Sequence, residues 1–200
     1  MARLILYFLL LPVTVQNVSA QHNDSTPRHQ WYVPHYVPAQ FAGNIGLFSL
    51  GVGYSSNHDN YHINFLYGYV PSSVAGTEIH TITAKNIFPL TRYGMKSGQT
   101  LIPYLGIGLT VEVGGNAFLR MPSHYPEGYY DFPKNVHVIA YGGARLQHLF
   151  QEDFKLLRGM EFYCEAGTVD IYLWYKAMSN HIRLNQIFSV ALGVNLLLPN

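Results

Sequence analysis

The chain has 200 residues, enough for one domain with a substantial core or for one small barrel. Only 12% of its residues are charged, against about 25% in an average globular protein, whereas 14% are aromatic. So little charge indicates that much of the surface faces something other than water, yet a mean hydropathy of +0.06 is too low for a helical membrane protein. The net charge of +1, without any Lys/Arg cluster, argues against a nucleic-acid partner.

The N-terminus has the pattern of an export signal. Arg3 supplies a positive charge, Leu4–Val15 is apolar, and Val18-Ser19-Ala20 is a small-residue cleavage site. The apolar stretch is too short to span a bilayer, which needs about 20 residues. We therefore predict a signal peptide over residues 1–20, with cleavage after Ala20. Cys164 is the only cysteine, which excludes an intramolecular disulfide, a Cys-based zinc site and a lipoprotein anchor.

Residues 21–39 are polar and contain three prolines, so they are predicted to form an extended N-terminal segment. From Gln40 onward the dominant pattern has a period of two, interrupted by turn residues, as in β-strands. The predicted strands, eight in number, cover 40–54, 60–70, 78–89, 99–114, 135–150, 159–167, 169–177 and 182–198.

One side of each strand is apolar, and the other is rich in Gly, Asn, Ser and single charges. In 60–70, for example, Ile63, Phe65 and Tyr67 alternate with His62 and Asn64. A soluble β-sandwich would carry charged residues on its outer faces, whereas this polar side suits a narrow interior filled by side chains. We therefore predict an all-β fold, a closed antiparallel transmembrane β-barrel over residues 40–200, in the outer membrane of a Gram-negative bacterium. Its expected partners are outer-membrane lipids or lipopolysaccharide and, during insertion, the barrel-assembly machinery.

The placement of the connection 115–134 is open. Counting back from a periplasmic C-terminus puts this long connection on the periplasmic side, although such barrels usually have short periplasmic turns. In the alternative register, 159–177 is one bulged strand through Gly167-Thr168 and 29–38 is the first strand. That register puts the connection outside the cell, but it requires Pro34 and Pro38 within a strand, where proline is disfavoured. The first register is preferred.

Several stretches are similar to one group of outer-membrane β-barrel proteins from Bacteroidetes-type bacteria. They are Gln40-Phe41-Ala42-Gly43-Asn44-Ile45-Gly46, Leu66-Tyr67-Gly68-Tyr69-Val70-Pro71, Ile79-His80-Thr81-Ile82-Thr83, Tyr125-Pro126-Glu127-Gly128-Tyr129-Tyr130, Gly167-Thr168-Val169-Asp170-Ile171-Tyr172-Leu173 and Leu192-Gly193-Val194. The resemblance covers Phe41 to Leu198 and implies the fold and the location, but no activity. Such barrels commonly end on an aromatic residue, whereas this sequence ends on Leu198-Pro199-Asn200.

The titratable residues on the predicted polar side form a candidate lumen network. They are Glu112, His137, Arg145, Glu161, Glu165, Asp170 and Arg183. In a bore only wide enough to be filled, these charges must largely neutralise one another, because an unpaired buried charge costs several kcal/mol. One interpretation is a salt-bridge network that holds the barrel's shape; the other is a proton- or ion-conducting file.

Three function hypotheses follow: a structural or binding role with no assigned activity, a lipid A-modifying hydrolase or acyltransferase, and a small pore or transport accessory. The candidate catalytic residues are Ser56, His58 and Asp59, in a predicted turn. The aromatic loop residues Tyr125, Tyr129 and Tyr130 are a candidate contact surface for glycan, protein or lipid headgroups. The histidines are scattered without metal-ligand spacing, so neither a metal nor any other cofactor is expected.

Overall fold

The computed structural model describes residues 32–56, 59–95, 98–114, 135–154, 156–178, 183 and 187–199, all within the compact unit Trp31–Asn200. The predicted signal peptide lies outside the described residues. The elements, in chain order, are β1 (Tyr36–Ala42), β2 (Phe48–Ser55), β3 (His62–Val70), α1 (Ser72–Ala75), β4 (Ile79–Pro89), β5 (Tyr93–Gly94), β6 (Gln99–Val113), β7 (Val136–Phe154), β8 (Leu157–Val169), α2 (Asp170–Met178) and β9 (Ser189–Leu197).

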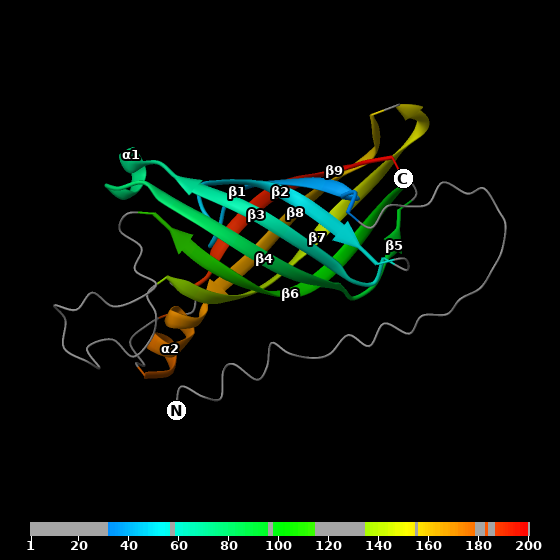
Figure 1. Ribbon diagram of the computed structural model, residues 1–200. Helices are drawn as coiled ribbons and strands as arrows, with labels where there is room; N and C mark the ends of the chain where they lie inside the picture. Colours follow the sequence, from blue (N-terminus) through cyan, green and yellow to red (C-terminus); the bar gives the residue numbers. More distant parts are fainter. Residues whose placement is uncertain are drawn as a thin grey trace, which may run out of the picture. The chain divides into compact units, whose positions relative to one another are not determined.

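The described strands form one antiparallel sheet in the order β4-β3-β2-β1-β9-β8-β7-β6, with the two-residue β5 beside β6. The sheet closes on itself because β4 also pairs with β6, in a ladder that runs from His80↔Val113 to Pro89↔Tyr104. In the described part of the chain, eight long strands therefore make a closed barrel, which confirms the predicted fold class (Figure 1). Closure leaves no unpaired sheet edge.

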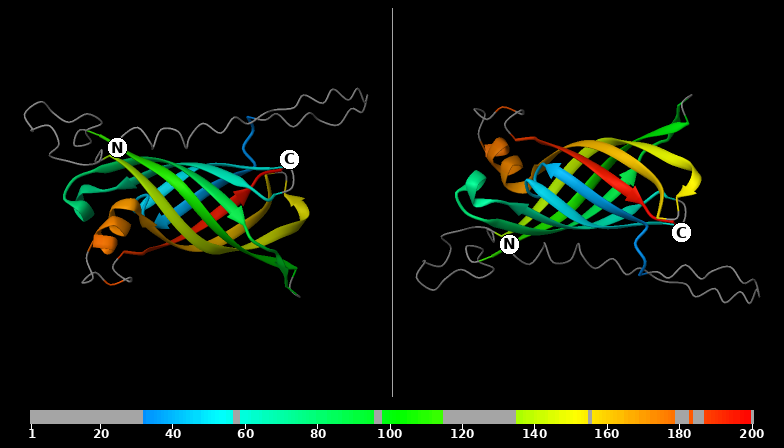
Figure 2. Two further views of the ribbon diagram at one scale, coloured as in Figure 1. Left: turned by 90° about the horizontal axis from the view of Figure 1, so that it is seen from below. Right: turned by 90° about the horizontal axis from the view of Figure 1, so that it is seen from above.

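The two ends of the barrel differ in their connections, and we name them accordingly. The terminal end holds the start of β1, the end of β9 and the short β7–β8 turn at 155–156. The loop end holds α1, α2 and the β1–β2 turn, together with Gly114 and Asn135, which flank the long β6–β7 connection. Figure 2 shows α1 and α2 at the same end from both further directions.

The structure corrects the predicted element boundaries at four places. The predicted strand 40–54 is wrong as a single strand, because it spans the end of β1, the β1–β2 turn and most of β2. The first strand, β1, begins at Tyr36 and contains Pro38. The predicted strand 169–177 is wrong, because Asp170–Met178 is the helix α2 and β8 runs through Gly167-Thr168 as one strand. The last strand begins at Ser189, later than the predicted 182. The alternative register is therefore nearer to the structure. The β6–β7 connection leaves and re-enters the barrel at the loop end, whereas the described C-terminal residues lie at the terminal end.

The alternation of side chains is as predicted, with apolar residues outside and polar residues inside. Large apolar side chains that are exposed on the outer wall include Phe41, Phe48, Leu50, Phe65, Tyr67, Ile82, Phe88, Leu105, Ile107, Val138, Phe162, Val190 and Leu192. Buried polar side chains include Gln40, His62, Asn64, Thr81, Thr83, Lys85, Thr110, Arg145, Glu161, Glu165, Thr168 and Asn195. This is the reverse of a water-soluble domain, in which charges lie outside and apolar groups inside.

An apolar cluster fills the bore towards the loop end. Ile45, from the β1–β2 turn, points inward and packs in one cluster with Leu66, Ile139 and Tyr141. The turn is held inside the barrel by Thr81, whose hydroxyl donates to the carbonyl oxygen of Ile45. The β1–β2 turn therefore closes the barrel as a short inward plug.

Candidate functional site: the polar interior of the barrel

The centre of the bore holds a buried ion pair between opposite walls. The Nζ of Lys85, on β4, lies 2.5 Å from the Oε1 of Glu165, on β8, and both side chains are almost fully buried. Tyr104 donates its hydroxyl to the other carboxylate oxygen at 2.9 Å. The ammonium also lies 4.2 Å from the centre of the Tyr141 ring, within cation–π range. These contacts replace the water that both charges lose on burial.

A second buried charge cluster lies nearer the terminal end. Arg145 lies 3.6 Å from the Oε2 of Glu161, and both side chains are at most 3% exposed. The Glu161 carboxylate also accepts hydrogen bonds of 2.8 Å from Gln147 and from Asn195. Because arginine can only donate, its 2.6 Å contact with Nε2 of His62 requires a lone pair on that nitrogen.

The charges of these two clusters balance. Lys85 and Arg145 face Glu165 and Glu161, two cations against two carboxylates. The sequence prediction named Arg145, Glu161 and Glu165 but omitted Lys85. Alternation within 78–89 is blurred because the outward His80 and Asn86 are polar and the inward Ile87 is apolar. Counting by twos from the inward Thr81 and Thr83 would have placed Lys85 in the bore.

At the terminal mouth, Asp59 joins the bore to the connection after β4. Its carboxylate accepts a hydrogen bond of 2.7 Å from Arg92 and lies 3.2 Å from Nε2 of His62. Arg92 also donates to the backbone carbonyl oxygen of Asp59 at 2.7 Å. The turn before β3 is thus tied across the rim to the chain after β4.

The remaining predicted network members lie at the loop end. His137 and Asp170 contact each other at 3.2 Å and are partly exposed, so they lie at the rim rather than in the bore. Asp170 also accepts from the backbone N–H groups of Val138 and Ile171, which fixes the start of α2. Glu112 pairs in register with the inward Thr81, near the same rim. Arg183 was predicted on the lumen side of the last strand, but it is exposed and precedes β9.

The interior leaves almost no free space around these groups. One cavity beside Lys85, Arg145 and Glu165 measures about 10 Å³, and a second, beside Ile45 and Tyr141, is of the same size. A cavity of this size has room for one water molecule at most. Around these groups, the described part of the bore is a packed core.

The other predicted sites are only partly within the described residues. Ser56 and Asp59 are described, and Asp59 is engaged by Arg92, but His58 lies outside the described residues. The candidate set Ser56, His58 and Asp59 therefore stays a prediction. Tyr125, Tyr129 and Tyr130 also lie outside them.

Comparisons with protein families, with curated proteins and with solved structures find no match to this chain. No helix among the described residues is long and apolar enough to cross a membrane. Within the same residues, no group of three or more His, Cys, Asp or Glu side chains is arranged to hold a metal ion. The case for a function therefore depends on the barrel's two surfaces, the packed bore and the apolar outer wall.

Proposed function

We propose that this protein is an integral outer-membrane β-barrel of a Gram-negative bacterium, with a structural or binding role. The observation that carries the proposal is the inverted distribution of side chains. Leu50, Phe162 and Leu192 are each more than half exposed on the outer wall, while Lys85 and Arg145 are buried inside. In water such an apolar wall would cause aggregation. In a bilayer it contacts the lipid chains, and the closed sheet pairs its own backbone N–H and C=O groups. The export signal predicted for residues 1–20 supports the same location.

The proposed orientation puts the terminal end in the periplasm and the loop end outside the cell. Connections at the terminal end are short, as at 155–156, whereas 114–135 and 170–188 at the loop end are long. Outer-membrane barrels have short periplasmic turns and long external loops. In this orientation Tyr125, Tyr129 and Tyr130 belong to the external connection, where they would contact a partner. The similarity to Bacteroidetes-type barrels and the use of the barrel-assembly machinery belong to the same proposal.

The packed bore argues for an anchoring or binding role over a pore. Lys85, Arg145, Glu161 and Glu165 are paired with one another, and the cavities beside them each hold at most one water molecule. A barrel of this width is filled by its side chains and serves as a rigid support for its loops.

Membrane insertion is tested with Cys164, which is exposed on the outer wall of β8. After expression in a Gram-negative host, the protein should fractionate with urea-washed outer membranes. Cys164 should resist a water-soluble maleimide in those membranes and react after solubilisation in denaturant. Recovery in the soluble periplasmic fraction, or rapid labelling of Cys164 in intact membranes, would overturn the proposal.

Orientation is tested with a matched pair of single-cysteine variants in a Cys164→Ser background. Ser73→Cys lies in α1 at the loop end, and Thr91→Cys lies in the connection after β4 at the terminal end; both positions are exposed. On intact cells an impermeant maleimide should label Ser73→Cys and spare Thr91→Cys until the outer membrane is opened. The reverse pattern would show that the long connections face the periplasm.

A further inference from the structure

One small cavity in the bore lies between the two buried charge clusters. It measures about 10 Å³, and its walls include Arg145 on β7, Asn195 on β9 and the central pair of Lys85 and Glu165. Within the described residues, Nε of Arg145 and Oδ1 of Asn195 have no hydrogen-bond partner, although the two side chains are only 2% and 4% exposed. Buried donors and acceptors nearly always have a partner, either in the protein or in an ordered water molecule.

The other polar atoms of these two side chains are held by neighbouring groups. The terminal nitrogens of Arg145 contact Glu161 at 3.6 Å and His62 at 2.6 Å. The Nδ2 of Asn195 donates to Oε2 of Glu161 at 2.8 Å. Because these contacts fix both groups, neither can turn towards another protein partner. Nε of Arg145 and Oδ1 of Asn195 are therefore the atoms available to a small molecule in the cavity.

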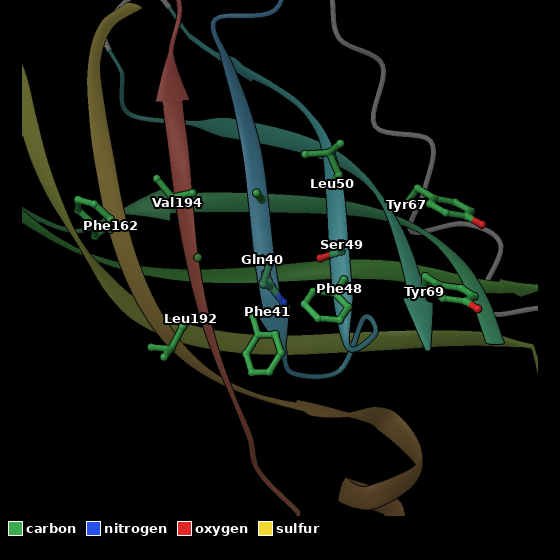
Figure 3. A pocket seen from close by; sticks show the side chains of 12 residues that line it. Gln40, Phe41, Phe48, Ser49, Leu50, Tyr67, Tyr69, Phe162, Leu192 and Val194 are labelled. Atoms are coloured by element: carbon green, nitrogen blue, oxygen red, sulfur yellow. The ribbon is translucent and has the colours of Figure 1, made fainter. Parts of the chain in front are cut away.

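The other donors in the wall of the cavity already have partners. Lys85 donates to Glu165 at 2.5 Å and to Oε1 of Gln40 at 3.3 Å, and Tyr163 donates to the same oxygen at 3.3 Å. Figure 3 shows Gln40 on β1, beside the outward Phe41. The Glu165 carboxylate is different, because each carboxylate oxygen can accept more than one hydrogen bond.

We propose that this cavity binds one water molecule, which accepts a hydrogen bond from Nε–H of Arg145 and donates one to Oδ1 of Asn195. Its second hydrogen is donated to the Glu165 carboxylate. Three hydrogen bonds are typical of a buried water molecule in a protein. The water joins the Lys85–Glu165 pair to the Arg145–Glu161 cluster, so that the two clusters form one network. This inference goes beyond the proposed function and does not depend on the membrane location.

The size and the chemistry of the cavity select water over an ion. Its ligand must accept from a guanidinium N–H and also donate to an amide oxygen. A chloride ion cannot donate. An ammonium or metal cation cannot accept, and it would lie beside the positive charges of Lys85 and Arg145. At about 10 Å³, the cavity has room for one water molecule and nothing larger.

The test is solution NMR of the purified full chain, labelled with ¹⁵N and folded in deuterated detergent micelles. The Nε–H proton of Arg145 should show cross-peaks at the water frequency that have opposite signs in NOE and ROE spectra, as a bound water molecule produces. Hydrogen exchange gives the same sign in both spectra, and the exposed Arg158 should show exchange only. If Arg145 in wild type shows no water cross-peak, or shows exchange only, the inference is wrong.

Two matched variants identify the source of the signal. Asn195→Leu removes Oδ1 together with one amide hydrogen bond to Glu161, and it should lose the water cross-peaks of Arg145. Gln147→Leu removes the other amide hydrogen bond to Glu161, which has the same length of 2.8 Å, and it should keep them. A signal relayed through an exchanging tyrosine hydroxyl would survive in both variants. Survival in Asn195→Leu, or loss in both variants, would overturn the inference.

A crystal structure of the wild-type protein provides a second measurement, which does not require that Asn195→Leu folds. It should show an ordered water peak within hydrogen-bond distance of both Nε of Arg145 and Oδ1 of Asn195. A cavity without a peak, or a rotated side chain that pairs either atom with the protein, would contradict the proposed site.

Discussion

Inside the barrel, tyrosine rings lie directly across from glycines on the neighbouring strand. A Cβ added to each of these glycines would lie within 2.3 Å of the facing ring, so the ring occupies the space that any other side chain would need. The pairs are Tyr36/Gly53, Tyr141/Gly106 and Tyr163/Gly193. Each of these three tyrosines faces a glycine because a narrow bore can hold a large ring only where the opposite position is empty.

Gly106→Ala should therefore destabilise the barrel by about 1–3 kcal/mol, because the Tyr141 ring must move within a packed core. Gly94→Ala is the control, since an added Cβ there meets nothing within 4 Å. Urea unfolding of the protein in lipid vesicles measures both free energies of unfolding. Similar urea midpoints for Gly106→Ala and Gly94→Ala would show that the Tyr141 ring does not need the space at Gly106.

The central ion pair predicts a non-additive mutant cycle. Lys85→Met leaves the Glu165 carboxylate buried without its cation and should cost about 3–5 kcal/mol. Combining Lys85→Met with Glu165→Leu removes both charges and should recover most of that loss. If the double variant is as unstable as the sum of the two single variants, the pair does not act as a unit. The same urea titration in vesicles provides the measurement.

At the scale of single elements, the turn before β3 contains a pH-dependent contact. Burial on its own raises the pKa of the Asp59 carboxyl, but the hydrogen bond from Arg92 and nearby positive charges lower it more. The net effect is a pKa below the ordinary value for aspartate. A depressed folded-state pKa stabilises the fold above the unfolded pKa of about 3.9, and this stabilisation is lost as the pH falls through the folded value.

Asp59→Asn should accordingly be less stable than wild type at pH 7, by no more than about 1 kcal/mol because Asp59 and Arg92 are partly exposed. The difference should shrink as the pH falls from 5 towards 2. The urea midpoints of the two proteins, followed over this range, test the expectation. A stability difference between wild type and Asp59→Asn that stays constant or grows as the pH falls would exclude a role for the Asp59 charge.

The two main errors of the sequence prediction, at α2 and at Pro38, have identifiable physical causes. Residues 169–177 were predicted as a strand from weak alternation, but Asp170–Met178 forms a helix, whose first turn carries the negative charge of Asp170. Pro38 was expected to disfavour a strand. It lies in β1, where the ladder to β9 is continuous but the register with β2 skips Val37 and Pro38. Proline, which has no N–H, is tolerated at this position because β2 does not pair with β1 there.

At the scale of the whole molecule, the packed bore predicts an electrically silent barrel. Purified protein in planar lipid bilayers should show no conductance steps, because the cavities beside Lys85 and beside Ile45 each hold at most one water molecule. Liposome swelling with small sugars should likewise match protein-free vesicles. Stable, protein-dependent conductance would contradict the interpretation of the interior as a filled core.

The closed barrel was predictable because one rule, alternation, applies along most strands and is only blurred in 78–89. The inward position of Tyr104, Arg145 and Glu161 followed from period two alone. Their partners did not, because contacts across the bore join strands that are distant both in sequence and around the wall, such as Lys85 on β4 and Glu165 on β8. Alternation gives the face that a side chain occupies but not its height in the barrel, which depends on the stagger between strands.

The pairing of Lys85 with Glu165, and of Arg145 with His62, has a consequence for how the chain enters a membrane. Each contact joins strands that are not adjacent in the sheet, so no isolated hairpin contains both partners. On the proposed membrane location, a β3–β4 hairpin delivered alone would carry the Lys85 ammonium into hydrocarbon without its carboxylate, at a cost of several kcal/mol. We therefore expect β4 and β8 to come together before either strand leaves the aqueous side.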